Sequence, residues 1–191
     1  MTPTAAFRTP MAPEDREARR VLGIDPGLSN LGTSVIEASP GPYAQVVKTV
    51  LFSANIKLGP SRNYRAFHQK LFKELDQLWD SYGPFACICA EEPTVIMENA
   101  AISGYLWYVY GMIRAWGFAR GIELKSLTAG QLKDTARTLM REEMGVRPKG
   151  QNPTKKEIGA LLRHLGVPRL PTDHEDDSVL AVISNIGQRL P

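Results

Sequence analysis

The residues best suited to metal or acid–base chemistry lie at the ends of predicted secondary-structure elements. Asp25 closes a short apolar strand at 21–25, and Glu91 directly follows a second apolar run at 85–90. The sequence His-Glu-Asp-Asp at 174–177 opens the last predicted helix. Ligands of open α/β sheets bind at strand ends, and buried neighbouring carboxylates repel each other unless a cation or a shared proton compensates them. If the two strands are adjacent, these residues predict a divalent-metal site.

Each of these motifs also has a purely structural interpretation. Asp25 is followed by Pro26-Gly27, which is typical of a tight turn, and Glu91 could lie exposed at a strand end. The acidic residues at 173–177 would complement the dipole of the helix that they open. A single histidine such as His174 is more often a surface or capping residue than a ligand. Only the conjunction of the three motifs favours chemistry.

The remaining pattern predicts the elements that position these groups. An antiparallel meander is expected from three strands at 21–25, 31–37 and 45–53. After it the pattern alternates between helix and strand: a helix at 62–80, a central strand at 85–90, a helix at 98–120 and a strand at 122–127. Three later helices begin at the capping pairs Thr128/Gln131, Thr154/Glu157 and Thr172/Glu175. The 191 residues suit one α/β domain at 21–191 after a flexible extension at 1–20.

The net charge of +3 conceals two basic blocks, 38–73 and 120–169, each with a net charge of +6. The first block has no acidic residue at all. Such blocks attract a polyanion, although a solubilising surface is the simpler alternative. The two cysteines, Cys87 and Cys89, lie in an apolar run and are interpreted as buried free thiols. With no apolar signal or membrane-length segment, the chain is expected to be soluble and intracellular.

Five motifs in order resemble those of the RuvC-type Holliday-junction resolvases of the RNase H-like nuclease superfamily. They are the sequence at 23–32 around Asp25, Ala90-Glu91-Glu92 with Asn99-Ala100, the sequence at 128–133 ending in Lys133, the sequence at 154–158 with Lys155, and the acidic helix start at 174–181. An Asp-x-Gly opening also occurs in sugar kinases and actin-like ATPases. Those proteins need a second lobe that this length does not provide.

The resemblance implies a mixed five-stranded sheet flanked by helices, and a catalytic quartet of Asp25, Glu91, His174 and Asp177. Glu92 and Asp176 remain alternatives for Glu91 and Asp177. The quartet would hold two Mg²⁺ or Mn²⁺ ions, as hard oxygen ligands do. Lys133 and Lys155 would contact the scissile phosphate. Lys133 is also expected to be a catalytic residue.

The implied activity is that of a crossover-junction endodeoxyribonuclease, a homodimer that nicks opposing strands of a four-way junction. Its expected location is the cytoplasm of a bacterial cell, or of a host cell if the protein is phage-encoded. Alternatives are an RNase H-like nuclease with a broader branched-DNA or RNA substrate, and a junction-binding protein with a degenerate metal site. The expected DNA-binding residues are Arg62, Arg65, Lys73, Lys133, Arg147, Lys149 and Lys155. Thr94 and Val95 stand where the family often has a junction-wedging aromatic, so Tyr64 or Tyr105 is a candidate for that role. The aromatic run at 105–113 is either a buried core helix or part of the dimer interface.

Overall fold

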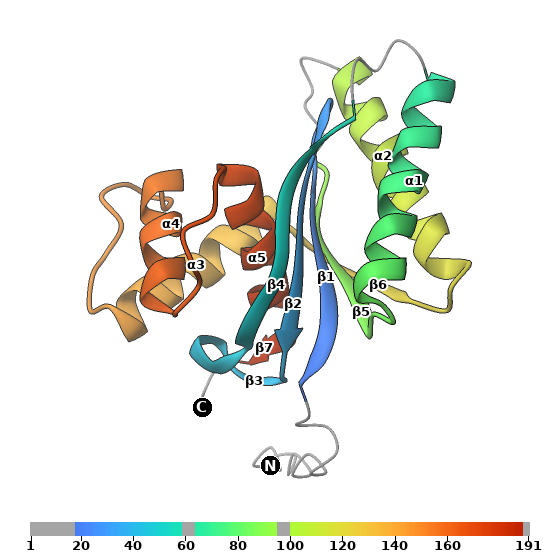
Figure 1. The fold of residues 1–191 in the computed structure, drawn as a ribbon. Coiled ribbons are helices and arrows are strands. Elements are labelled where there is room, and N and C mark those ends of the chain that lie inside the picture. The colour runs from blue at the N-terminus through green and yellow to red at the C-terminus, as the bar shows by residue number, and fades with distance from the viewer. Residues whose placement is uncertain (1–17, 59–63, 95–99, 189–191) are drawn as a thin grey trace, which may run out of the picture.

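The protein is built on a mixed five-stranded sheet with helices on both faces (Figure 1). The computed structural model describes residues 18–58, 64–94 and 100–188. The sheet has the strand order β4-β2-β1-β5-β6. Its strands are β1 (Arg19–Pro26), β2 (Asn30–Ala38), β4 (Val47–Lys57), β5 (Cys87–Glu92) and β6 (Glu123–Thr128).

The first three long strands form the predicted antiparallel meander, because β2 pairs with both β1 and β4. A short strand β3 (Gly41–Pro42) and a 3₁₀ turn at Tyr43–Gln45 interrupt the connection from β2 to β4, and β3 pairs with β7 (Gly187–Gln188). Strand β1 begins at Arg19, inside the segment expected to be a flexible extension, since Arg19 pairs with Ala38. The ordered sheet therefore starts two residues before the predicted boundary.

Strands β1, β5 and β6 run parallel to one another. In the strand order β1 is the middle strand, and β5 lies beside it in the interior of the sheet. Apolar residues on both faces predict such a position, because helices then cover both sides of the strand. Cys87 and Cys89 are buried free thiols whose sulfur atoms lie 3.8 Å apart. Their side chains share one face of β5, as the two-residue period of a strand requires.

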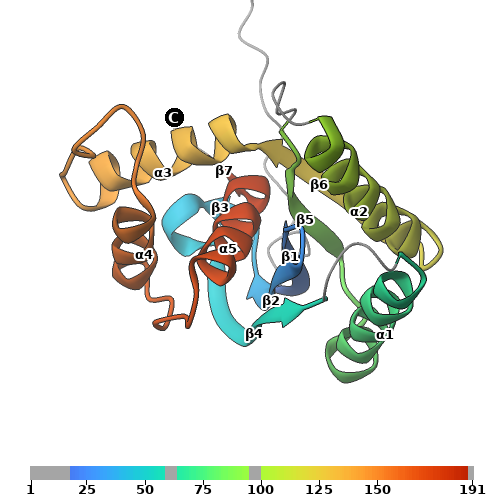
Figure 2. The same ribbon diagram turned by 90° about the horizontal axis from the view of Figure 1, so that it is seen from above.

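One face of the sheet is covered by α1 (Tyr64–Tyr82) and α2 (Ala100–Phe118) (Figure 2). The predicted apolar side of α1 is confirmed, because its four core residues are buried: Phe67, Leu71, Leu75 and Leu78. They pack with Leu22, Ile24, Ile88 and Ala90 of the central strands. This layer fixes which face of β1 and β5 is left for the other helices.

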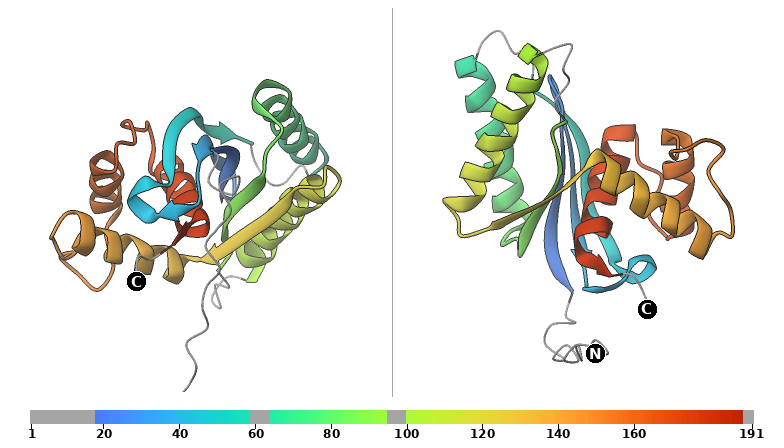
Figure 3. Two further views of the ribbon diagram at one scale, coloured as in Figure 1. Left: turned by 90° about the horizontal axis from the view of Figure 1, so that it is seen from below. Right: turned by 180° about the vertical axis from the view of Figure 1, so that it is seen from behind.

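The opposite face is covered by α3 (Ala129–Glu143) and α5 (Asp173–Ile186), and α4 (Lys155–His164) packs on these two helices. Figure 3 shows the helices on either side of the sheet. The predicted starts of all three helices are confirmed. At Thr128 and Thr154 the capping box is complete. At the third start the Glu175 carboxylate accepts a hydrogen bond of 2.7 Å from the Thr172 backbone N–H. No helix within the described ranges is long and apolar enough to cross a membrane.

Candidate active site

Asp25 and Glu91 come from neighbouring parallel strands at the same level of the sheet. The last paired residues of β1 and β5 are Ile24 and Ala90, and the two carboxylates follow one residue later. Since Ile24 and Ala90 belong to the core under α1 and α2, strand alternation turns Asp25 and Glu91 toward the face covered by α5. The metal-site prediction was conditional on the adjacency of these two strands, and β1 and β5 are adjacent.

Helix α5 lies directly on the meander because two glycines leave room for its backbone. A Cβ atom at Gly23 would overlap the carbonyl oxygen of Ser178, and one at Gly32 would overlap the carbonyl oxygen of His174. The Ser178 hydroxyl donates to the carbonyl of Glu175 at 2.8 Å and lies 2.9 Å from the hydroxyl of Ser34. These contacts hold the first turn of α5 over the ends of β1 and β2.

The close approach of α5 places His174 against Asp25. The Nδ1 atom of His174 lies 2.6 Å from an Oδ atom of Asp25. This hydrogen bond and the charge of Asp25 raise the pKa of His174, although burial of the ring opposes them. The Asp25 side chain is only 13% exposed and that of His174 is 41% exposed. The pair therefore joins a buried carboxylate to an imidazole that solvent still reaches.

Glu91 lines a cleft of about 320 Å³ together with Lys133, Lys155 and Asp177. Burial and, next, the negative charge of Asp25 raise the pKa of the Glu91 carboxyl. The ammonium groups of Lys155 and Lys133 act in the opposite direction. The two lysines that the motifs assigned to phosphate contact therefore lie close enough to Glu91 to affect its ionisation.

Asp177 is buried in the same cleft and forms an ion pair with the Lys155 ammonium. The alternative residues lie elsewhere. Asp176 lines a separate basic cleft with Arg163, and the position of Glu92, one residue after Glu91 on β5, turns its side chain to the opposite face. The cleft thus contains Glu91 and Asp177 and neither alternative.

The donor set fits a hard divalent cation by its chemistry. Three carboxylates and one imidazole gather at one edge of the sheet. Burial and, next, the charge of Asp25 raise the pKa of the Glu91 carboxyl, and a bound cation would offset both effects. Among the residues that the structure describes, no three histidine, cysteine or acidic side chains are close enough together to hold a single ion. The Asp177 carboxylate is instead occupied by its ion pair with Lys155.

The predicted DNA-binding residues fall into two groups on opposite faces of the sheet. Arg65 and Lys73 are exposed on α1. The other four residues lie on the α3–α4 side: Lys133, Arg147, Lys149 and Lys155. Arg62 lies outside the described residues. The two basic blocks therefore do not form one continuous surface on a single helical layer.

The aromatic helix is partly buried and partly exposed. Tyr105 is 8% exposed and packs edge-on against Phe67, with ring centroids 5.4 Å apart, so its ring is part of the core and is not placed to enter DNA. The side chain of Tyr64 lies outside the described residues. Trp107 and Tyr108 are 38% and 39% exposed. Helix α2 is therefore not wholly buried within one chain.

No protein-family model matches the chain. Solved structures do match it over most of its length. The structure of Thermus thermophilus RuvC in complex with a Holliday junction substrate has a TM-score of 0.66 and 17% identity, covering 86% of this chain and 91% of that one. A second T. thermophilus RuvC structure has a TM-score of 0.64 and 17% identity, covering 86% and 92%.

The yeast mitochondrial Holliday junction resolvase Ydc2 matches with a TM-score of 0.52 and 12% identity, covering 90% of this chain and 81% of that one. At these identities the likeness concerns the fold. The chain has the RNase H-like fold of the RuvC structures, and the predicted fold class is confirmed.

Two structural features of this face were not predicted from the sequence. Arg137 and Arg141 line a pocket with the predicted Arg147. Both arginines follow Lys133 on the same helix, at distances of four and eight residues. This spacing places the three side chains on one face and could have identified the arginines from the sequence. The second feature is the close approach of α5 at Gly23 and Gly32, which only the packing of the helix on the sheet reveals.

Proposed function

We propose that the protein is a metal-dependent, structure-selective endonuclease that resolves Holliday junctions by paired symmetric nicks, hydrolysing DNA phosphodiester bonds. The observation that carries this proposal is the convergence of Asp25, Glu91, His174 and Asp177 at one edge of a RuvC-like sheet. A neighbour of the same fold is a RuvC in complex with a Holliday junction substrate.

The four residues would hold two Mg²⁺ or Mn²⁺ ions per site, and such ions supply an activated water and neutralise phosphate charge. Asp25 is central to this set, since it contacts His174 and its charge acts on Glu91. Because Nδ1 of His174 faces Asp25, Nε2 is the ring nitrogen left to bind a ligand or carry a proton.

Lys133 and Lys155 would bind the phosphate that enters the cleft. Both ammonium groups act on the Glu91 carboxyl at the same edge. Lys155 now forms an ion pair with the Asp177 carboxylate, and a DNA phosphate could replace that carboxylate as its negatively charged partner. Exchange of Lys155 from Asp177 to the phosphate would leave that carboxylate available as a ligand at the moment when DNA arrives.

Two cuts on opposing strands require two sites, so we propose that the protein acts as a homodimer. The exposed aromatic side chains of α2, Trp107 and Tyr108, provide a surface on which a second copy would bury apolar area. Sedimentation velocity at micromolar concentration should show a dimer. A monomer, both with and without DNA, would contradict this part of the proposal.

The test compares a synthetic four-way junction with a linear duplex and an RNA–DNA hybrid, each with Mg²⁺, Mn²⁺ or chelator. The Asp25→Asn variant should reduce junction cleavage to the level seen in chelator. Asp80→Asn is the matched control, because Asp80 is an exposed residue of α1. Full activity of Asp25→Asn would refute the metal site.

The same substrates separate the alternatives. Cleavage of flaps, forks or the hybrid at rates comparable with the junction would indicate a broader RNase H-like nuclease. Tight junction binding without cleavage in either metal would indicate a junction-binding protein with a degenerate site, an alternative favoured by the Lys155 ion pair at Asp177.

A further inference from the structure

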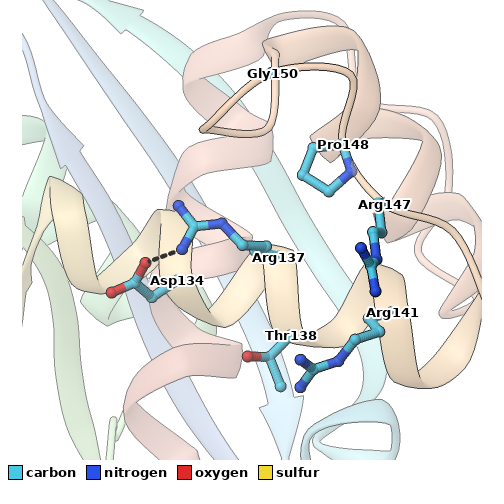
Figure 4. Close-up of a pocket in the computed structure, with 7 residues that line it drawn as sticks. All are labelled: Asp134, Arg137, Thr138, Arg141, Arg147, Pro148 and Gly150. Carbon is cyan, nitrogen blue, oxygen red and sulfur yellow. Dashed lines mark hydrogen bonds and ion pairs between the residues drawn. The ribbon is translucent and has the colours of Figure 1, made fainter.

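A second basic cavity lies on the α3 side of the molecule, outside the cleft that contains Glu91. It has a volume of about 500 Å³ and is formed by α3 from Asp134 to Arg141 and by the loop before α4 (Figure 4). The lining residues are Asp134, Arg137, Thr138, Arg141, Arg147, Pro148 and Gly150. The lining thus includes three guanidinium groups and one carboxylate, and we call this cavity the arginine pocket.

The loop that completes the arginine pocket is held in place by hydrogen bonds. The Arg137 guanidinium donates to the side-chain oxygen of Asn152 at 2.9 Å. The Lys149 backbone N–H donates to the Glu157 carboxylate at 3.0 Å, and the Val146 N–H donates to the Met140 carbonyl at 3.1 Å. The pocket is therefore formed before any ligand binds, which lowers the entropic cost of binding.

The positive charge of the arginine pocket is only partly compensated. Arg137 forms an ion pair of 2.7 Å with Asp134, and its Nε atom is buried without a hydrogen-bond partner. Arg141 reaches the neighbouring Glu142 only at 3.5 Å. No ion pair to Arg147 occurs among the residues that the structure describes. The pocket keeps guanidinium donors for an anionic ligand.

The arginines continue a row that begins in the cleft. Lys133 lines the cleft of Glu91, whereas Arg137 and Arg141 line the arginine pocket. Residues four apart on a helix are neighbours about 6 Å apart along its axis, so the row spans about 12 Å. One strand of duplex DNA carries a phosphate about every 3.4 Å of helix axis. The row is therefore long enough to follow several consecutive phosphates.

We propose that the arginine pocket binds backbone phosphates of the DNA strand whose scissile phosphate enters the cleft. The proposal rests on the proposed nuclease function and adds a second anchoring point, about two helical turns along α3 from Lys133. Guanidinium groups suit this role because their planar donors can bind phosphate oxygens in a bidentate manner. Like charges four residues apart destabilise an isolated helix, and a bound phosphodiester chain offsets that repulsion.

The test measures equilibrium binding of a four-way junction and a linear duplex as a function of salt, in chelator. The double variant Arg141→Gln/Arg147→Gln removes two exposed guanidinium groups and leaves Arg137, which holds the loop through Asn152. The control Arg19→Gln/Arg114→Gln removes the same charge from exposed positions at the start of β1 and on α2. Thermal unfolding verifies that both variants are folded.

The slope of log K against log salt should become shallower by about one to two units in the pocket variant, since each phosphate contact contributes about 0.9. The control should retain the wild-type slope. Equal slopes in the two variants would overturn the proposal. A second measurement tests whether inorganic phosphate raises the unfolding temperature of the wild type and not of the pocket variant. If it does so while the DNA slopes of the two variants stay equal, the pocket holds a free anion and the assignment to DNA is wrong.

Cleavage assays keep this result separate from the proposed function. A wild-type protein that binds DNA through the arginine pocket and cuts no junction refutes the nuclease and leaves the phosphate site standing. A pocket variant that cuts and binds like the wild type refutes the phosphate site and leaves the nuclease standing.

Discussion

His174 and Asp25 are 149 residues apart in the sequence and share a hydrogen bond of 2.6 Å between Nδ1 and the carboxylate. The first turn of α5 reaches the end of β1 because Gly32 leaves space for the His174 backbone. This pair joins the last motif of the chain to the first. The chemistry proposed for the protein depends on that contact more than on any other.

The pair predicts a pH-dependent contribution to stability in chelator. The folded-state pKa of His174 is raised above its ordinary value of 6.5, so its contribution is complete below pH 6.5 and is lost as pH rises through the raised pKa. The stability difference between the wild type and His174→Asn should shrink over that interval. Thermal unfolding from pH 5 to 9 measures it. When both proteins also carry Asp25→Asn, the stability difference caused by His174→Asn should not shrink as pH rises.

The glycine at position 32 predicts a coupling between packing and activity. Gly32→Ala should displace the start of α5, lower the free energy of unfolding by about 1–3 kcal/mol and reduce junction cleavage. Gly111→Ala on α2 is the control, since a Cβ there meets no atom within 4 Å, and it should stabilise the protein by about 0.5–1 kcal/mol. Chemical denaturation gives both values. An unchanged cleavage rate in a folded Gly32→Ala protein would contradict the placement of His174.

The burial of Glu91 and, next, its repulsion by Asp25 predict that this carboxylate destabilises the metal-free protein. The pKa of Glu91 is raised in the folded state, so the wild type loses stability as pH rises through that pKa, whereas Glu91→Gln does not titrate. Glu91→Gln should therefore be the more stable protein at neutral pH in chelator and inactive with metal. Glu92→Gln, one residue along β5, is the matched control. Loss of cleavage in Glu92→Gln alone would assign the ligand to Glu92.

The ion pair of Lys155 with Asp177 predicts competition with metal. Lys155→Gln should bind Mn²⁺ more tightly, because the Asp177 carboxylate is no longer occupied, and should cleave DNA more slowly, because a phosphate contact is lost. Without metal the variant should lose about 1–3 kcal/mol of stability, since Asp177 stays buried without its partner. Mn²⁺ titration followed by electron paramagnetic resonance measures the affinity. Weaker Mn²⁺ binding would show that Lys155 does not compete for Asp177.

Local patterns predicted the parts of the fold that local chemistry determines. The capping pairs at Thr128 and Thr154 placed two helix starts correctly, because both halves of a capping box lie within four residues. The apolar run before Glu91 predicted a central strand. The adjacency of Asp25 and Glu91 was conditional on the strand order, which the structure supplies. Strand β5 begins at Cys87 and not at Phe85, since pairing with β1 and β6 sets its limits.

Features that depend on tertiary packing were not predictable in the same way. The two basic blocks carry equal charge in the sequence, yet α1 and α3 lie on opposite faces of the sheet. The arginine pocket requires a loop that hydrogen bonds from Arg137 and Glu157 hold beside α3. The ion pair between Lys155 and Asp177 joins two helix starts 22 residues apart. None of these contacts has a local sequence pattern.

The most direct measurement is the mapping of cleavage on a four-way junction whose four strands are labelled in turn. With Mg²⁺ or Mn²⁺, the wild type should produce nicks at symmetric positions on one pair of opposing strands, and His174→Asn and Asp177→Asn should produce almost none. Chelator should abolish the nicks, and a linear duplex of the same sequence should stay intact. Equal cleavage of the linear duplex, or nicks that persist in chelator, would contradict a metal-dependent junction resolvase.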